Sequence, residues 1–206
     1  MQDLRITLIQ TDLFWEQREE NLNHFDHLLD RIVEPSDLIL FPETFNTGFS
    51  VNPSTCAEAM DGPSIQFLRD KAHEKNAVIM ATLLIHDDTE HYNRLVSMHP
   101  DGTFETYDKR HLFRLSEEYK NFKGGNKKLI IDVRGWNISP VICYDLRFPE
   151  IFREAVAAHR PELFIVIANW PEKRIRHWVA LLQARAIENQ AYVVGVNRIG
   201  RDPYYA

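Results

Sequence analysis

The stretch PVICYDLRFPE, residues 140–150, begins as an apolar run and ends in a cluster of charges. The apolar part is typical of a buried strand, but Asp145, Arg147 and Glu150 cannot all lie in an apolar core. The strand must therefore reach a polar region at or just beyond Cys143, one of only two cysteines in the chain. Pro149 is tolerated in a first helical turn, so a helix is expected to follow. The stretch predicts a sheet edge that carries a thiol.

Predicted strands and helices alternate along the rest of the chain. Alternating or short continuous apolar runs predict strands at 4–13, 36–41, 77–85, 92–98, 103–107, 129–133, 138–144, 161–170 and 191–197. Apolar residues spaced three and four apart predict helices at 21–33, 61–76, 148–160 and 174–190. Tight links at residues 100–102 and at Gly135 predict two pairs of adjacent strands. This order favours an α/β domain with a mixed sheet, or two packed sheets, covered by helices.

The composition is that of a soluble globular protein. With 206 residues, 44% of them hydrophobic and 26% charged, the chain fits a single domain with a sizeable core. A net charge of −6 argues against nucleic acid or an acidic membrane surface as a partner. The sequence starts without a signal-peptide pattern, and no apolar run approaches the roughly 20 residues that span a bilayer. Two widely spaced cysteines favour a reducing compartment, so we expect a cytoplasmic protein.

Three predicted strands end at a chemically reactive side chain. Glu43 follows the strand at 36–41, Lys109 follows the strand at 103–107, and Cys143 follows the apolar run that begins at Pro140. In open α/β sheets the ligand crevice tends to form at the carboxyl ends of strands. These residue types could supply a base, an oxyanion stabiliser and a nucleophile. We treat them as a candidate catalytic constellation.

Each member also has an ordinary structural interpretation. Cys143 could be a small core residue, Glu43 an exposed carboxylate and Lys109 part of a solvated basic face. Aromatic neighbours would partly desolvate Glu43 and make it a stronger base. A helix N-terminus and nearby cations would favour the thiolate of Cys143. Cys56 lies in the polar segment NPSTCAEAM without such neighbours, and we expect it to be incidental.

Three further segments offer alternative interpretations as functional sites. HDDTEH, residues 86–91, superficially resembles a metal cluster, but its place between two apolar runs predicts a solvated turn. His111 lies close to Lys109 and could form a Cys-His pair with Cys143. The basic segment KRIRH, residues 173–177, is interpreted as a helix start in this acidic protein and not as a nucleic-acid contact.

The motifs together resemble a known superfamily. FPETF, YDKRHLF, ICYDLRFPE and ARAIENQAYVVGVNRIG resemble, in this order, the nitrilase superfamily of carbon–nitrogen hydrolases. FNTGFS and ANWPEKRIRHWVALLQARAIENQ are most similar to its omega-amidase branch. The resemblance implies an α-β-β-α sandwich, no metal or organic cofactor, and a homodimer or higher homo-oligomer. Superfamily members continue beyond the position of Gly200, so we expect residues 1–206 to form one domain that lacks its C-terminal strands.

The resemblance also implies a role for each motif residue. Cys143 would be the nucleophile, and Glu43 the base that activates first the thiol and later a water. Lys109 would stabilise the tetrahedral oxyanion, and the backbone N–H of Tyr144 would be a second oxyanion donor.

Further site residues are expected around these motifs. The resemblance implies a second active-site glutamate, for which the spacing to the following aromatic residue favours Glu118 over Glu117. Arg147 and the cations of EKRIRHW are candidates for binding a substrate carboxylate, although Arg147 could instead pair with a neighbouring acid. Trp170 and Phe45 are the expected walls of the substrate site.

The expected reaction is hydrolysis of the terminal amide of a 2-oxo acid amide. A small-molecule substrate such as 2-oxoglutaramate or 2-oxosuccinamate would give the acid and ammonia through a cysteine thioester. Two alternatives stay open. The same residues could act on another carbon–nitrogen substrate, such as deaminated glutathione, a nitrile or an N-carbamoyl amino acid, or the chain could be an inactive scaffold or binding protein.

Overall fold

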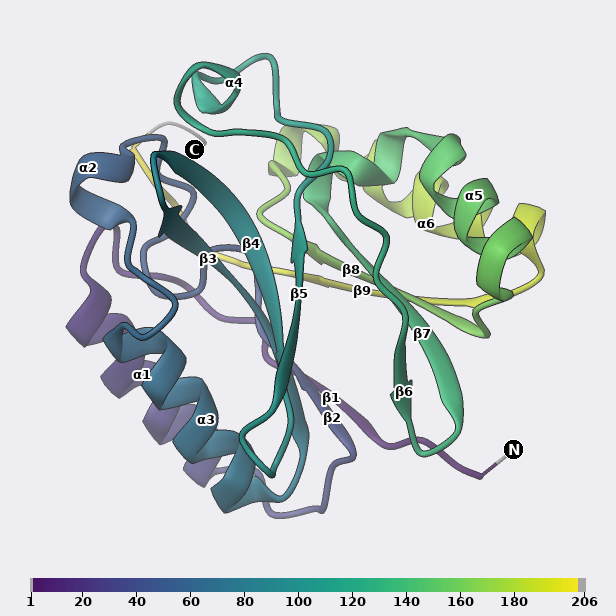
Figure 1. The fold of residues 1–206 in the computed structure, drawn as a ribbon, viewed down its shortest axis with the longest axis horizontal. Helices are drawn as coiled ribbons and strands as arrows, with labels where there is room; N and C mark the ends of the chain where they lie inside the picture. Colours follow the sequence, from purple (N-terminus) through teal and green to yellow (C-terminus); the bar gives the residue numbers. More distant parts are fainter. Residues whose placement is uncertain (1, 204–206) are drawn as a thin grey trace.

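The computed structural model describes residues 2–203 and has four layers, in the order helices, sheet, sheet, helices (Figure 1). The first sheet has the order β1 (Ile6–Leu8), β2 (Leu38–Leu40), β3 (Val78–Asp87), β4 (Glu90–Met98), β5 (Phe104–Asp108). The second has the order β6 (Ile131–Val133), β7 (Trp136–Ile142), β8 (Leu163–Ala168), β9 (Tyr192–Asn197). The outer faces are covered by α1 (Arg18–Asp30) and α3 (Pro63–Lys75) on one side, and by α5 (Pro149–His159) and α6 (Ile175–Asn189) on the other. The predicted α-β-β-α sandwich is confirmed.

Strand direction brings several strand ends to the same edge. β1, β2 and β3 are parallel, and two antiparallel pairings through β4 return β5 to the same direction. In the second sheet β7, β8 and β9 are parallel, and β6 is antiparallel to β7. The two predicted strand pairs around residues 100–102 and Gly135 are thus confirmed as the hairpins β4–β5 and β6–β7.

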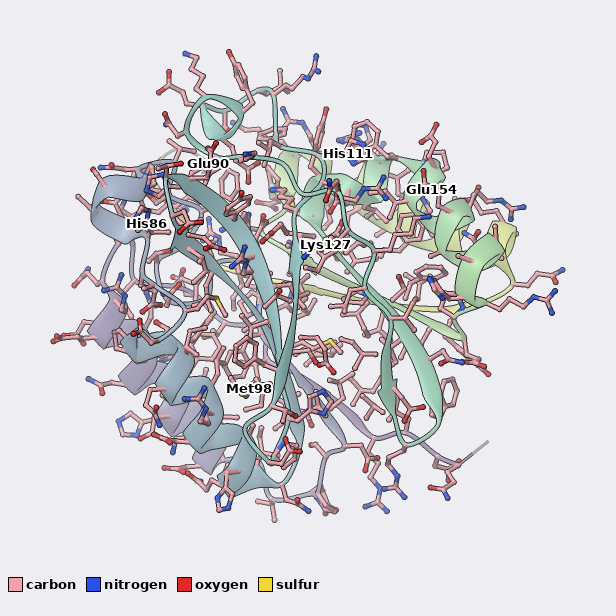
Figure 2. All side chains as sticks on the ribbon, viewed as in Figure 1. His86, Glu90, Met98, His111, Lys127 and Glu154 are labelled. Atoms are coloured by element: carbon pink, nitrogen blue, oxygen red, sulfur yellow. The ribbon has the colours of Figure 1, made fainter. Side chains whose placement is uncertain are left out.

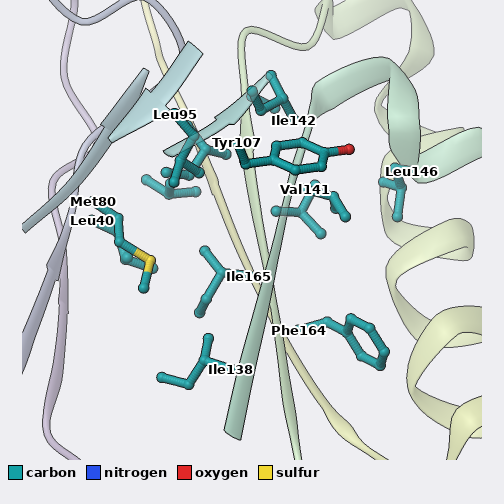
Figure 3. Packing of buried hydrophobic residues seen from close by; sticks show 14 of the residues in the cluster. Leu40, Met80, Leu95, Tyr107, Ile138, Val141, Ile142, Leu146, Phe164 and Ile165 are labelled. Carbon is teal, nitrogen blue, oxygen red and sulfur yellow. The ribbon is translucent and has the colours of Figure 1, made fainter. Parts of the chain in front are cut away.

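The period-two alternation of the strands divides the apolar residues between two core clusters. Leu38 and Leu40 of β2 belong to the cluster between the sheets, whereas Ile39 between them packs with residues of α1 and α3. Figure 3 shows Leu40 and Met80 of the first sheet facing the space into which Ile138 and Ile165 of the second sheet point. Each sheet therefore has one face against the other sheet and one face against helices.

The helices bury most of the residues that their spacing predicts. Ile65, Leu68 and Ala72 of α3 are at most 1% exposed, and α5 starts at Pro149 as expected. In α6 Trp178 is buried as predicted, but the helix also buries Arg185, whose guanidinium donates two hydrogen bonds to the carbonyl oxygen of Leu146. That contact fixes α6 against the turn that follows β7.

Some local predictions were wrong in extent. β1 covers only Ile6–Leu8 instead of residues 4–13, and two short helices, α2 (Pro53–Cys56) and α4 (Glu118–Asn121), were not predicted. The short helices lie in polar segments, where local hydrogen bonds and not an apolar period set the backbone. Cys56 is 1% exposed because α2 turns its side chain toward Leu84 and Phe122.

We expect Ile165→Ala to lower the free energy of unfolding by about 2–5 kcal/mol, because it leaves a cavity in the cluster between the sheets. Urea unfolding followed by circular dichroism would measure the change. Val33, which is 90% exposed, provides the control, since Val33→Ala should shift the free energy by no more than about 0.5 kcal/mol. Equal effects of the two substitutions would contradict the assigned packing.

Candidate active site

The carboxyl groups of Glu43 and Glu118 meet at the buried ammonium group of Lys109. Lys109 follows β5, and its Nζ donates to Oε1 of Glu43, 2.8 Å away, and to both carboxyl oxygens of Glu118 at 2.9 and 3.0 Å. Glu43 and Lys109 are 0% exposed and Glu118 is 1% exposed. The strand-end residues Glu43 and Lys109 are therefore brought together as expected.

The structure distinguishes the two candidate glutamates at the start of α4. Glu118 is buried and also accepts a hydrogen bond from the backbone N–H of Phe113, at 2.6 Å. Glu117 is exposed and forms an ion pair with Lys120 on the surface. Only Glu118 contacts the buried lysine, which agrees with the preference based on spacing.

A strained turn presents Cys143 at the end of β7. The residue has a φ of +44°, in the left-handed region that non-glycine residues seldom adopt, and it starts a short 3₁₀ helix, Cys143–Arg147. The buried carboxylate of Asp145 holds this turn by accepting hydrogen bonds from Tyr107 Oη at 2.8 Å, Ile142 N at 3.2 Å and His111 N at 2.8 Å. Cys143 as a whole residue is 8% exposed.

Burial dominates the electrostatics of the site. Burial alone would lower the pKa of Lys109, but the charges of Glu118 and Glu43 raise it above its ordinary value, so the ammonium stays charged. Burial raises the pKa of Glu118, and the charge of Lys109 partly offsets this effect. Burial and the charge of Glu43 also raise the pKa of the Cys143 thiol well above its usual range. The expectation of a resting thiolate is therefore corrected: the thiol is neutral and lies beside a carboxylate.

Two buried asparagines complete the hydrogen bonding of Glu43. Asn93 in β4 donates from Nδ2 to Glu43 Oε1 at 2.9 Å and to Glu118 Oε1 at 3.1 Å. Asn169 follows β8; its backbone N–H donates to Glu43 Oε2 at 2.8 Å, and its carbonyl accepts from Cys143 Sγ at 3.8 Å. Sequence reasoning missed both residues. Asn169 could have been noticed as a polar residue directly after the apolar strand β8. Asn93 could have been noticed as an asparagine within the predicted strand at 92–98.

A cavity opens beside the thiol between aromatic and cationic side chains. Its lining consists of Phe49, Phe113, Cys143, Tyr144, Arg147, Asn169, Trp170, Pro171 and Arg174. Among residues 2–203, no acidic side chain belongs to this lining. The structure thus places the predicted residues Tyr144, Arg147 and Trp170 around the same cavity as Cys143.

Phe45 is the predicted wall residue that the structure places elsewhere. It is 0% exposed and packs edge-on against Phe25 and Phe41 in the cluster beneath α1 and α3. The chain turns after Glu43, so Phe45 points toward the helices and Phe49, four residues later, reaches the cavity. The sequence could not show that Phe49 and not Phe45 reaches the cavity, because both residues follow the same strand.

The two arginines of the cavity are held by aromatic rings. Arg147 lies over the ring of Trp170, with 4.9 Å between Cζ and the ring centroid, and donates to Nδ1 of His177 at 3.2 Å. Arg174 lies over Phe113 at 5.6 Å. Stacking orients a guanidinium while leaving in-plane N–H groups for a ligand. The sequence suggested the cations of the EKRIRHW segment as candidates for binding a carboxylate. Of these cations, the structure places Arg174 at the cavity.

His86 and His111, which the sequence suggested as alternative site residues, lie in different parts of the structure. His86 and Glu90 flank the turn of the β3–β4 hairpin, apart from His111 near the start of α5 (Figure 2). His111 stacks on Phe148 with 3.6 Å between ring centroids and contacts Asp145 through Nδ1 at 3.1 Å. Within residues 2–203 there is no group of three or more metal-ligating side chains, and no helix is long and apolar enough to cross a membrane.

Comparison with known proteins identifies the class of enzyme. Residues 5–205 match the carbon–nitrogen hydrolase family. Omega-amidase YafV of Escherichia coli (strain K12) is 43% identical over 202 residues, which cover 98% of this chain and 77% of the relative. 2-Oxoglutaramate amidase of Bacillus subtilis (strain 168) is 30% identical over 201 residues, covering 96% and 77%. The chain belongs to the carbon–nitrogen hydrolase family, in the nitrilase superfamily, and is an enzyme related to omega-amidases.

Solved structures agree with this assignment. XC1258 of Xanthomonas campestris, a CN-hydrolase superfamily protein with an arsenic adduct in its active site, superposes with a TM-score of 0.95 at 40% identity. The match covers 100% of this chain and 79% of that chain. An amidase from Nesterenkonia sp. gives a TM-score of 0.87 at 26% identity, covering 96% and 77%. The sandwich is therefore the fold of the family.

We expect iodoacetamide to alkylate Cys143 before Cys56, because Cys143 lines the cavity whereas Cys56 is 1% exposed. Because the pKa of Cys143 is raised, its thiolate fraction and labelling rate should still increase above pH 9.0, the ordinary pKa of a thiol. Peptide mass spectrometry after short exposures would follow each site. Equal and slow labelling of both cysteines would contradict the assignment of an accessible reactive thiol.

Proposed function

We propose that the protein is an omega-amidase that hydrolyses the terminal amide of a 2-oxo acid amide such as 2-oxoglutaramate or 2-oxosuccinamate. The observation that carries this proposal is the pair of arginines, Arg147 and Arg174, in a cavity that opens beside Cys143 and is lined by no acidic residue among those described. Such a cavity favours a substrate with an anionic group beyond its amide. Arginine suits a carboxylate because its planar N–H groups can bind both oxygens. The names of the E. coli and B. subtilis relatives support the same substrate class.

In the proposed first step, Glu43 takes the proton of Cys143 and the sulfur attacks the amide carbon. The raised pKa of the thiol makes a base necessary, and the Glu43 carboxylate is adjacent to it. Negative charge then develops on the amide oxygen. The Lys109 ammonium and the backbone N–H of Tyr144 are proposed to stabilise it.

Collapse of the tetrahedral intermediate breaks the carbon–nitrogen bond and leaves a thioester. The proton held by Glu43 passes to the leaving nitrogen, which departs as ammonia. Glu43 next takes a proton from a water molecule that attacks the thioester carbon, and the thiol is regenerated with the acid product. Glu118 is proposed to hold Lys109 in place during both steps, through its contacts at 2.9 and 3.0 Å.

We propose a cytoplasmic homodimer or higher homo-oligomer that needs no metal or organic cofactor. Exposed apolar residues on α6 support self-association: Ile175, Val179 and Ile187 are 42%, 49% and 77% exposed. A nitrile, an N-carbamoyl amino acid and deaminated glutathione remain the alternative substrates, and an inactive binding protein is the alternative from another class.

Incubation of the protein with 2-oxoglutaramate should release ammonia, and Cys143→Ala should abolish the release because no nucleophile remains. A coupled glutamate dehydrogenase assay would measure ammonia. A panel of nitriles, N-carbamoyl amino acids and deaminated glutathione, ranked by kcat/KM, would test the substrate class. Unchanged turnover in the Cys143→Ala variant would remove this residue from its role, and a nitrile with the highest kcat/KM would refute the omega-amidase proposal.

Arg174→Ala should raise KM for 2-oxoglutaramate about 10- to 100-fold, because a hydrogen bond to a charged group contributes about 1.5–3 kcal/mol. KM for a neutral amide of similar length should change less than about twofold. Arg176→Ala, on the exposed side of the same segment, is the matched control and should leave both values unchanged. Equal losses for the charged and the neutral amide would show that Arg174 does not bind the substrate carboxylate.

A further inference from the structure

We propose that Asn93 is a positioning residue that orients the base Glu43 through a hydrogen-bonded ring that includes Lys109 and Glu118. The inference rests on the proposed roles of Glu43 and Cys143 but not on the identity of the amide substrate. No motif of the sequence analysis included Asn93.

The ring is formed by two donors that share the same two acceptors. Lys109 Nζ lies 2.8 Å from Glu43 Oε1 and 2.9 Å from Glu118 Oε1. Asn93 Nδ2 lies 2.9 Å and 3.1 Å from the same two oxygens. The backbone closes the group further, since the N–H of Lys109 donates to the carbonyl of Asn93 at 2.9 Å. One cation and one neutral amide thus bridge two carboxyl groups.

The amide orientation of Asn93 is determined by the two glutamates. Turning the amide over would place Oδ1 against both carboxyl groups, where it would repel them. In the observed orientation Oδ1 has no hydrogen-bond partner among residues 2–203, and Asn93 is 0% exposed, so Oδ1 is a buried acceptor. An unsatisfied buried acceptor costs about 1–3 kcal/mol. The fold therefore accepts a cost at Asn93 that the contacts with Glu43 and Glu118 offset.

This arrangement leaves one oxygen of Glu43 for chemistry. Oε1 receives Lys109 and Asn93, and Oε2 receives the backbone N–H of Asn169, whose carbonyl accepts from the Cys143 thiol. Oε2 accepts only this backbone hydrogen bond among the contacts of residues 2–203, and the residue that donates it also contacts the thiol. Holding Oε1 from two directions fixes the carboxylate plane and thus the direction in which Oε2 accepts a proton.

An amide suits this position better than a charged group. Glu43, Glu118, Lys109 and Cys143 are the titratable groups that face one another here, and a second cation would hold Glu43 too strongly as an anion to accept a proton. A third carboxylate would compete for the single ammonium and favour protonation of its neighbours. Asn93 adds a donor without adding a charge.

The test replaces Asn93 by the isosteric acid. In Asn93→Asp the acidic limb of the kcat/KM profile should move up by at least about one pH unit, because an added negative charge favours the protonated form of Glu43. The pH dependence of Cys143 alkylation by iodoacetamide should move in the same direction. Asn93→Ala should lower kcat about 100-fold while KM changes less than about threefold, since orientation is lost and substrate contacts remain.

Asn46 offers a closely matched control. Its Nδ2 donates to the buried carboxylate of Glu58 at 3.0 Å, and its Oδ1 is likewise buried without a partner. Asn46→Asp makes the same chemical change outside the ring, so it should lower thermal stability without moving either pH profile. Unmoved profiles in folded Asn93→Asp, or an equal shift in Asn46→Asp, would overturn the proposal. The alkylation profile needs no substrate, so failure of the omega-amidase assignment would be recognised separately.

Discussion

The arrangement of the active site depends on the ion pairs of the buried Lys109 ammonium. The ammonium lies between Glu43 and Glu118 with no exposure to water, and none of the three charges could be buried alone without a large desolvation cost. Glu43 lies 66 residues before Lys109, so the ion pairs also tie the loop after β2 to the end of β5 and the start of α4. Breaking such a pair would cost about 3–5 kcal/mol, and the same contacts arrange the candidate catalytic groups.

Strand direction and the packing of two sheets explain why a base and a thiol meet. β2 and β5 deliver Glu43 and Lys109 from the first sheet, whereas β7 delivers Cys143 from the second. The apolar cluster between the sheets holds these edges face to face. Asp145 then holds Cys143 in its strained conformation, at a position where the residue both borders the apolar cluster and lines the cavity.

Charge is distributed unevenly across the site, and this distribution separates its two tasks. Deep in the site, two carboxyl groups share one ammonium and one amide donor, which suits proton transfer with the neutral thiol. At the cavity the guanidinium groups of Arg147 and Arg174 lie over aromatic rings, which suits recognition of an anion. Asn169 connects the two regions, since it contacts Glu43 and Cys143 and also lines the cavity.

The sequence by itself determined the α/β class and most strand and helix positions, because alternation and helical spacing are local properties. Its strand-end motifs made Glu43, Lys109 and Cys143 candidates for one site, and their resemblance to the nitrilase superfamily implied the sandwich. The resemblance implied a second glutamate, and the spacing to Phe122 favoured Glu118 over Glu117. Only the tertiary structure decided that Asn93 and Asn169 hold Glu43, that Phe49 and not Phe45 reaches the cavity, and that Arg174 joins Arg147 there. It also decided that burial keeps the thiol of Cys143 neutral. These features depend on which side chains packing brings into contact and on how much water packing excludes, and neither quantity is encoded by neighbours along the chain.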